Sequence, residues 1–149
     1  MKNADTLNDL VRINNDRIEG YNKAAAETKT EDHDLRSVFN RMAEQSRGFA
    51  EELRQLVRNE NAEPADGATG AGKIYRTWMD VKATFTGHNR KGILASCEYG
   101  EDAAQKAYKT ALEDGDLPST VRNIIESQQT SLRTSHDEIK RMRDAQPND

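Results

Sequence analysis

Two stretches of this chain nearly repeat each other: Glu19-Gly-Tyr-Asn-Lys-Ala-Ala25 and Glu98-Tyr-Gly-Glu-Asp-Ala-Ala104. Each begins with a glutamate, continues with a Gly/Tyr pair in one order or the other, and ends in Ala-Ala. The two copies lie in the first and third of four long amphipathic segments, so the spacing predicts one helical hairpin used twice. The aligned fourth positions are Asn22 and Glu101, and only the second of them carries a carboxylate.

Apolar residues recur every three or four positions through four long segments, which is the pattern of amphipathic helices. These segments cover residues of about 6–27, 32–59, 90–113 and 118–145. No stretch alternates with period two over a useful length, so the chain is predicted to be all-α. Its 149 residues suffice for a single domain, residues 1–149, folded as a four-helix bundle.

A long connection joins the second and third of these helices. Residues 61–72 are rich in Ala, Gly, Pro and Asp, which is typical of an exposed connector. An apolar face returns at residues 73–86 and predicts a short crossover helix along the flank of the bundle; a fifth packed helix is the alternative. We expect two copies of the chain to form a homodimer through the aromatic residues of this piece, Tyr75, Trp78 and Phe85.

The composition excludes several classes of function. Acidic and basic residues are interspersed along every segment, with a formal net charge of -4, so no basic block is available for a phosphate backbone and nucleic acid is not an expected partner. Cys97 is the single cysteine, which excludes an internal disulfide and a thiolate metal cluster. No signal peptide or membrane-spanning stretch is present, so a cytoplasmic protein is expected.

The sequence offers no convincing catalytic constellation. Residues 67–73 match the spacing of a phosphate-binding loop, but Ile74 follows where Ser or Thr should hold magnesium, and no strand precedes the loop. With one histidine inside a helix and no strand-turn-helix nucleophile elbow, a Ser-His-Asp or Cys-His set cannot be assembled. We therefore do not predict an enzyme.

Polar residues at comparable depth on the inner edges of the four helices are more informative. A polar group on an inner face costs about 1–3 kcal/mol if it stays unpaired, so each of them needs a partner or a ligand. The residues concerned are Asn22, Glu44, Arg47, Glu101, Arg133 and His136.

The chain resembles the ferritin-like four-helix bundles and, within them, a bacterial family of unknown function with the same crossover. The resemblance covers nearly the whole chain. It rests on Ile18-Glu-Gly-Tyr21, Phe49-Ala-Glu-Glu-Leu53, Trp78-Met-Asp80, Gly100-Glu-Asp-Ala-Ala104 and His136-Asp137. Metal-binding members of this group place a glutamate on the first and third helices and Glu-x-x-His on the second and fourth.

The resemblance implies a ligand set that this chain keeps only in part. The six ligand places fall on the six inner polar residues, and only Glu44, Glu101 and His136 are of a metal-binding type. Arg47 stands in place of an imidazole and Arg133 in place of a carboxylate, and an arginine does not deprotonate to bind a cation. We therefore predict a buried polar network in which Arg47 and Arg133, together with Asn22, pair with Glu44 and Glu101.

The predicted function follows from this loss of ligands. We expect a non-catalytic binding or assembly module with a degenerate metal site and no cofactor, and the resemblance implies a stress-related role. The alternative is a divergent iron-binding or di-iron carboxylate protein of the ferroxidase or storage type, holding iron or manganese with Glu44, Glu101 and His136. A single-metal centre that also uses Glu19 and Glu98 is the remaining inorganic alternative.

Overall fold

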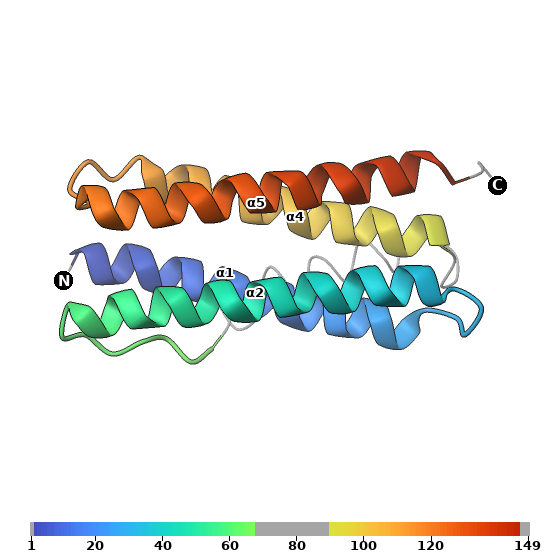
Figure 1. Cartoon of the computed structure of the whole chain (residues 1–149), viewed down its shortest axis with the longest axis horizontal. Helices are drawn as coiled ribbons and strands as arrows, with labels where there is room; N and C mark the ends of the chain where they lie inside the picture. Colours follow the sequence, from blue (N-terminus) through green and yellow to red (C-terminus); the bar gives the residue numbers. More distant parts are fainter. Residues whose placement is uncertain (1, 68–89, 147–149) are drawn as a thin grey trace.

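The computed structural model describes residues 2–67 and 90–146 and places four α-helices in them (Figure 1). The helices are α1 (Lys2–Glu27), α2 (His33–Asn59), α4 (Arg90–Leu112) and α5 (Ser119–Asp144). The prediction of an all-α four-helix bundle is confirmed. The predicted crossover helix at 73–86, with Tyr75, Trp78 and Phe85, lies outside the described residues.

The bundle consists of two antiparallel hairpins laid side by side. Helices α1 and α2 form one hairpin, and α4 and α5 form the other (Figure 1). Helix α1 packs against α4 with closely approaching backbones, whereas α2 and α5 approach each other at few points. Long side chains bridge α2 and α5 instead, for example from Arg41 Nη2 to Glu138 Oε2 at 2.8 Å.

The apolar core is divided into two clusters along the bundle axis. One lies toward the beginning of α1 and includes Leu10, Leu53, Val57 and Leu132. The other lies toward the end of α1 and includes Tyr21, Phe39, Leu94 and Ile139. Burying a side chain of this size stabilises the fold by about 1.5–3 kcal/mol, so the two clusters supply the main driving force for folding. Between them the bundle interior is polar.

The two similar stretches lie on α1 and α4, but their buried positions are offset by one residue from the alignment of the sequence letters. Burial pairs residues whose numbers differ by 80, because the buried positions on α1 and α4 are Gly20 with Gly100, Tyr21 with Glu101 and Ala24 with Ala104. Asn22 is exposed and is therefore not the structural counterpart of Glu101. One residue of offset is a rotation of about 100° around a helix, which is enough to exchange core and surface.

An arginine side chain links neighbouring chain segments at each end of the bundle. At one end Arg90 donates to Asp32 Oδ1 at 2.8 Å and to Asp34 Oδ2 at 2.9 Å, which fixes the start of α4 against the α1–α2 connection. At the other end Arg122 donates to the carbonyl oxygens of Leu112 and Asp114, at 2.9 and 2.7 Å. Leu112 is the last residue of α4, and the last carbonyls of a helix have no intrahelical partner, so Arg122 acts as a cap for this helix.

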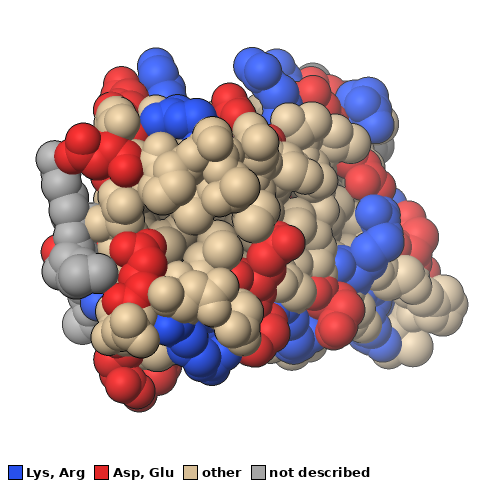
Figure 2. All heavy atoms as spheres, turned by 60° about the vertical axis from the view of Figure 1, so that its left-hand side comes forward, with Lys and Arg blue, Asp and Glu red and all other residues tan. Residues whose placement is uncertain are grey.

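The surface carries charges of both signs. On the face shown in Figure 2, acidic and basic side chains surround a central area without charge. The described residues of this face therefore form no continuous basic surface. Within 2–67 and 90–146, none of the helices combines the length and apolarity needed to span a membrane.

Candidate functional site

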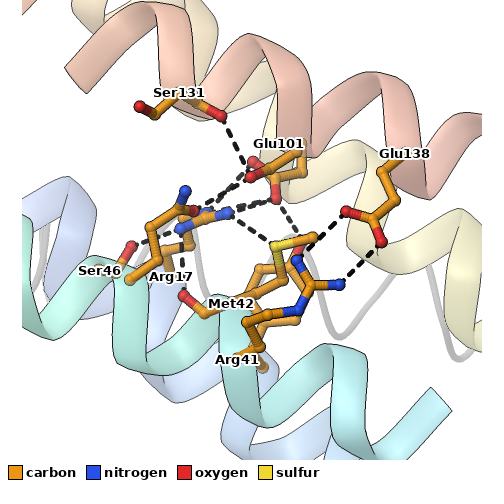
Figure 3. Close-up of polar contacts among 10 residues, drawn as sticks. Arg17, Arg41, Met42, Ser46, Glu101, Ser131 and Glu138 are labelled. Carbon is orange, nitrogen blue, oxygen red and sulfur yellow. Dashed lines mark hydrogen bonds and ion pairs between the residues drawn. The ribbon is translucent and has the colours of Figure 1, made fainter. Parts of the chain in front are cut away.

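A buried ion pair occupies the centre of the bundle, between the two apolar clusters (Figure 3). Arg17 on α1 and Glu101 on α4 join at 2.7 Å from Nη2 to Oε2, and their side chains are 1% and 0% exposed. Arg17 Nε also donates to Glu101 Oε1 at 3.1 Å. The contact is thus bidentate, which is the strongest geometry between a guanidinium and a carboxylate.

The remaining groups of Arg17 and Glu101 are also partnered. Arg17 Nη1 donates to Ser46 Oγ at 2.7 Å and to the carbonyl oxygen of Met42 at 3.2 Å, both on α2 (Figure 3). The hydroxyl of Tyr21, one turn along α1, donates a hydrogen bond to Glu101 Oε2. Three helices therefore meet in one network, which has the full set of hydrogen bonds that a buried charge requires.

The surroundings of Arg17 and Tyr21 raise the pKa values of both side chains. Burial alone would lower the pKa of Arg17, but the charge of Glu101 and the hydrogen bonds to it raise that pKa above its usual value. Burial and the Glu101 carboxylate raise the pKa of Tyr21 well above its usual value, although Arg17 lowers it. Tyr21 therefore remains a protonated donor, and the Arg17 guanidinium also lies 5.1 Å from the centre of its ring.

A second polar layer crosses the bundle beside the first and uses one residue from each helix. Asn14 Nδ2 on α1 donates to the Tyr108 hydroxyl on α4 at 2.9 Å, and that hydroxyl donates to Gln128 Oε1 on α5 at 2.6 Å. Gln128 Nε2 then donates to Glu52 Oε1 on α2 at 2.7 Å. The first three residues are buried and Glu52 is exposed, so the layer runs from the interior to the surface.

The structure does not bring the predicted network residues together in the interior. Arg47 Nη1 does contact Glu44 Oε2 at 3.0 Å, but the two side chains are 45% and 76% exposed. Asn22, which accepts from Arg47 Nη2 at 3.2 Å, is exposed as well. Arg133 is exposed on α5. The prediction of a buried network of Asn22, Arg47 and Arg133 is therefore wrong, since these helices turn those positions toward solvent.

His136 lies at the seam between α4 and α5 and is held by two carboxylates. Its Nε2 lies 2.7 Å from Asp102 Oδ1, and its Nδ1 lies 3.1 Å from Asp137 Oδ1. Both ring nitrogens can donate only when the imidazole carries a proton on each, so this geometry favours the imidazolium form. Partial burial lowers the pKa of His136, but the hydrogen bonds to Asp137 and Asp102 outweigh it and leave the pKa raised.

This raised pKa predicts a pH dependence of stability. Because the folded pKa of His136 exceeds the unfolded value of about 6.5, its contribution is fully present below pH 6.5 and is lost as pH rises through the folded pKa. We expect His136→Gln to remove about 0.5–1 kcal/mol near pH 5.5 and less near pH 8.5. Urea titrations of both proteins at the two pH values measure this, and an equal difference at both would contradict the assignment.

Comparison with known proteins places this bundle in a family. The family described as "Domain of unknown function (DUF2383)" matches residues 2–114. The chain belongs to this family. The solved structure of a Dps1 mutant from Mycobacterium smegmatis is similar to this DUF2383 protein, with a TM-score of 0.82 and 17% identity over 95% of each chain. The fold is thus ferritin-like, as the sequence predicted. No curated protein sequence matches the chain at a significant level.

The central residues of the DUF2383 bundle do not fit a metal ion. Both oxygens of Glu101 already accept hydrogen bonds from Arg17, and Oε2 accepts a third from Tyr21. Glu44 lies outside with Arg47, and both nitrogens of His136 face carboxylates. Across the described part of the chain, no three His, Cys, Asp or Glu side chains gather in a way that could hold a metal ion.

The two glutamates considered for a single-metal centre are also engaged elsewhere or exposed. Glu98 is partly buried on α4 and forms an ion pair with Arg143 of α5. Glu19 is exposed on α1. Neither is grouped with two further carboxylate or histidine ligands among the described residues.

Arg17 is the functional residue that the sequence analysis missed. The buried residues of α1 include Leu10, Asn14, Arg17, Tyr21 and Ala24, spaced by four, three, four and three. This spacing is the inner stripe of a packed helix, so the signal was present in the sequence. Ile18 is the more hydrophobic residue of this adjacent pair, but the structure leaves Ile18 partly exposed and buries Arg17.

Proposed function

We propose that this DUF2383 protein is a non-catalytic binding or assembly module whose centre is held by the Arg17–Glu101 ion pair instead of a metal. The observation that carries the proposal is the fully buried carboxylate of Glu101, whose oxygens are occupied by a guanidinium and a phenol. In the ferritin-like proteins that the chain resembles, glutamates at the bundle centre hold metal ions. Here a fixed positive charge takes the role of the cation, which is what a degenerate metal site would contain.

The chemistry of the centre also supports a structural role over a catalytic one. The guanidinium cannot act as a base because its raised pKa keeps it protonated, and the raised pKa of Tyr21 keeps the phenol protonated. Each of these groups is turned toward another side chain of the same centre. The centre therefore fixes the register of three helices and leaves binding or assembly to the outer surface. We place the protein in the cytoplasm as part of the same proposal.

Metal analysis and thermal melting test the proposal. We expect purified full-length protein to carry far less than one iron or manganese per chain by elemental analysis. We also expect its melting temperature to stay unchanged on adding Fe²⁺, Mn²⁺ or a chelator. A metal bound at a hundred times its Kd would add about 2.7 kcal/mol, or roughly 5–10 °C in a chain of this size.

Two variants test whether any bound metal is held by the glutamates predicted as ligands. Glu101→Gln changes the buried carboxylate, and Glu44→Gln changes a side chain that is 76% exposed. Stoichiometric iron, or a metal-induced rise in melting temperature that disappears in both variants, would replace the proposal by the iron-binding alternative. If the protein binds no metal and metal does not raise its melting temperature, the result supports the ion-pair centre.

A further inference from the structure

Helix α4 carries an exposed aromatic side chain on its outer face. Tyr99 is 39% exposed and is the large hydrophobic residue that the described part of the chain leaves exposed. Ala103, Lys106 and Thr110 follow it at spacings of four, three and four, so all four residues lie on one stripe of the helix. Closer to the start of α4, Ser96 is buried. Among the described residues, the exposed part of this stripe therefore runs from Tyr99 toward the end of α4.

A groove of about 410 Å³ opens further along the same face, between α4 and α1. Its floor is apolar and is formed by small residues of α4 together with Ile13 of α1. Its lining also includes the exposed polar residues Asp9 of α1 and Lys106 and Thr110 of α4. The groove thus combines an apolar depth with acceptors and donors at its edge, which suits a side chain with an apolar body and a polar tip.

The exposed tyrosine and the groove are arranged for self-association. A two-fold contact requires a patch that is complementary to itself, with knob and hole on one face. If two α4 helices lie antiparallel with the axis near Ala103, Tyr99 of each copy lies opposite Ala107 of the other, at the groove. Side chains lean toward the beginning of their helix, and in an antiparallel partner this direction points further into the groove, toward Thr110 and Asp9.

The charges along α4 favour the same antiparallel arrangement. Beside this stripe, the exposed acidic residue Asp102 adjoins Ala103 and the exposed basic residue Lys106 follows it, whereas Glu98 is already paired with Arg143 of α5. Antiparallel pairing about Ala103 therefore places Lys106 opposite Gly100 of the second copy, two positions from that copy's Asp102. A parallel arrangement would place like charges at the same level. Opposite charges at the rim of an interface contribute to register and orientation more than to affinity.

We infer that two copies of this chain associate through antiparallel α4 helices, each inserting Tyr99 into the α1–α4 groove of the other. This inference deepens the proposed assembly function and names the partner as a second copy. The contact is small, so the dimer is of the weak, reversible class. It differs from the aromatic surface at 73–86 that the sequence suggested, which lies outside the described residues.

Sedimentation equilibrium of the full chain, with variants of Tyr99, tests the inference. We expect a concentration-dependent dimer whose dissociation constant rises at least about thirtyfold in Tyr99→Glu, the scale of an aromatic hot spot. Tyr99→Phe keeps the apolar body and should dimerise nearly as the parent does. Because Tyr99 is exposed, both variants should melt at the temperature of the parent, which excludes misfolding as the cause.

Disulfide trapping tests the geometry. In Ala103→Cys the two new thiols face each other across the axis, so mild oxidation should give a covalent dimer. Thr134→Cys, on the exposed side of α5, is the matched control and should give little. Cys97 is buried and serves as a common background.

The outcomes separate this inference from the proposed function. A chain that stays monomeric, or a dimer that is unaffected by Tyr99→Glu and not trapped at residue 103, overturns the α4 contact and leaves the metal-free centre standing. Stoichiometric metal with a Tyr99-dependent dimer would leave the α4 contact standing and overturn the proposed function. A dimer weakened by Tyr99→Glu and trapped through residue 103 supports the inference.

Discussion

Replacing Arg17 by methionine should lower the free energy of unfolding by about 3–5 kcal/mol, because the variant leaves the buried Glu101 carboxylate without its counter-charge. Glu101→Leu should cost a similar amount, since it leaves the guanidinium buried and unpaired. Most domains have only about 5–15 kcal/mol in total, so either single variant should be close to unfolding. Urea denaturation followed by circular dichroism measures the loss.

The double variant Arg17→Met/Glu101→Leu separates the cost of an orphaned charge from the value of the pair. A buried ion pair contributes little over apolar residues of similar volume, so the double variant should regain at least half of the loss seen in either single variant. Part of the loss should remain, because the Tyr21 hydroxyl and Ser46 Oγ lose their partners. The coupling energy from this cycle should therefore be several kcal/mol.

Arg47→Met and Glu44→Leu are the matched controls. This pair has the same chemistry and a contact of 3.0 Å, but it lies at the surface of α2. Each control should change the free energy of unfolding by less than about 0.5 kcal/mol. If the Arg17 and Glu101 variants behaved like these controls, the central pair would not be the element that fixes the bundle, and the proposed role of the centre would fail.

The fold could be predicted from the sequence because it depends on patterns that many residues share. Each helix has several turns of apolar residues at spacings of three and four, and an error at one position leaves the pattern intact. The bounds of α2 and α4 in the structure therefore lie within one residue of the prediction. Only α1 differs visibly, since it begins at Lys2 and not near Thr6. Its first turn is fixed by packing, with Ala4 buried and Thr6 Oγ1 donating to Asp114 of the α4–α5 connection.

The central site was harder to predict from the sequence because it depends on single positions. Successive residues of a helix point about 100° apart, so aligning Asn22 with Glu101, when Tyr21 is the buried counterpart, exchanges the interior for the surface. The sequence predicted a guanidinium beside Glu101, and the structure supplies it from α1 rather than from Arg47 or Arg133. A buried arginine is rare enough that burial frequencies alone argue against it. The burial of Arg17 is favourable only because the folded structure pairs it with Glu101.

The two polar layers differ in charge, so breaking the second layer should cost less free energy of unfolding than breaking the first. In the layer next to the ion pair, Tyr108 accepts from Asn14 and donates to Gln128, and all three residues are at most 2% exposed. Burial raises the pKa of Tyr108 above its usual value, so the hydroxyl keeps its proton and remains a donor. These three buried groups are neutral, so a broken contact among them leaves a buried dipole instead of a buried charge.

Tyr108→Phe should therefore lower the free energy of unfolding by about 1–3 kcal/mol, less than the loss of Arg17 but well above that of a surface change. Gln128 Oε1 loses its donor, whereas Asn14 Nδ2 keeps the carbonyl oxygen of Leu10 at 2.9 Å, so Gln128 should carry most of the cost. Adding Gln128→Leu to Tyr108→Phe removes the orphaned acceptor and should recover part of the loss. Tyr99→Phe makes the same chemical change at an exposed position and should leave the urea midpoint unchanged. Equal midpoints for the two phenylalanine variants would mean that this layer contributes no specificity, and the Arg17–Glu101 centre would then be the layer that fixes the register of α1, α2 and α4.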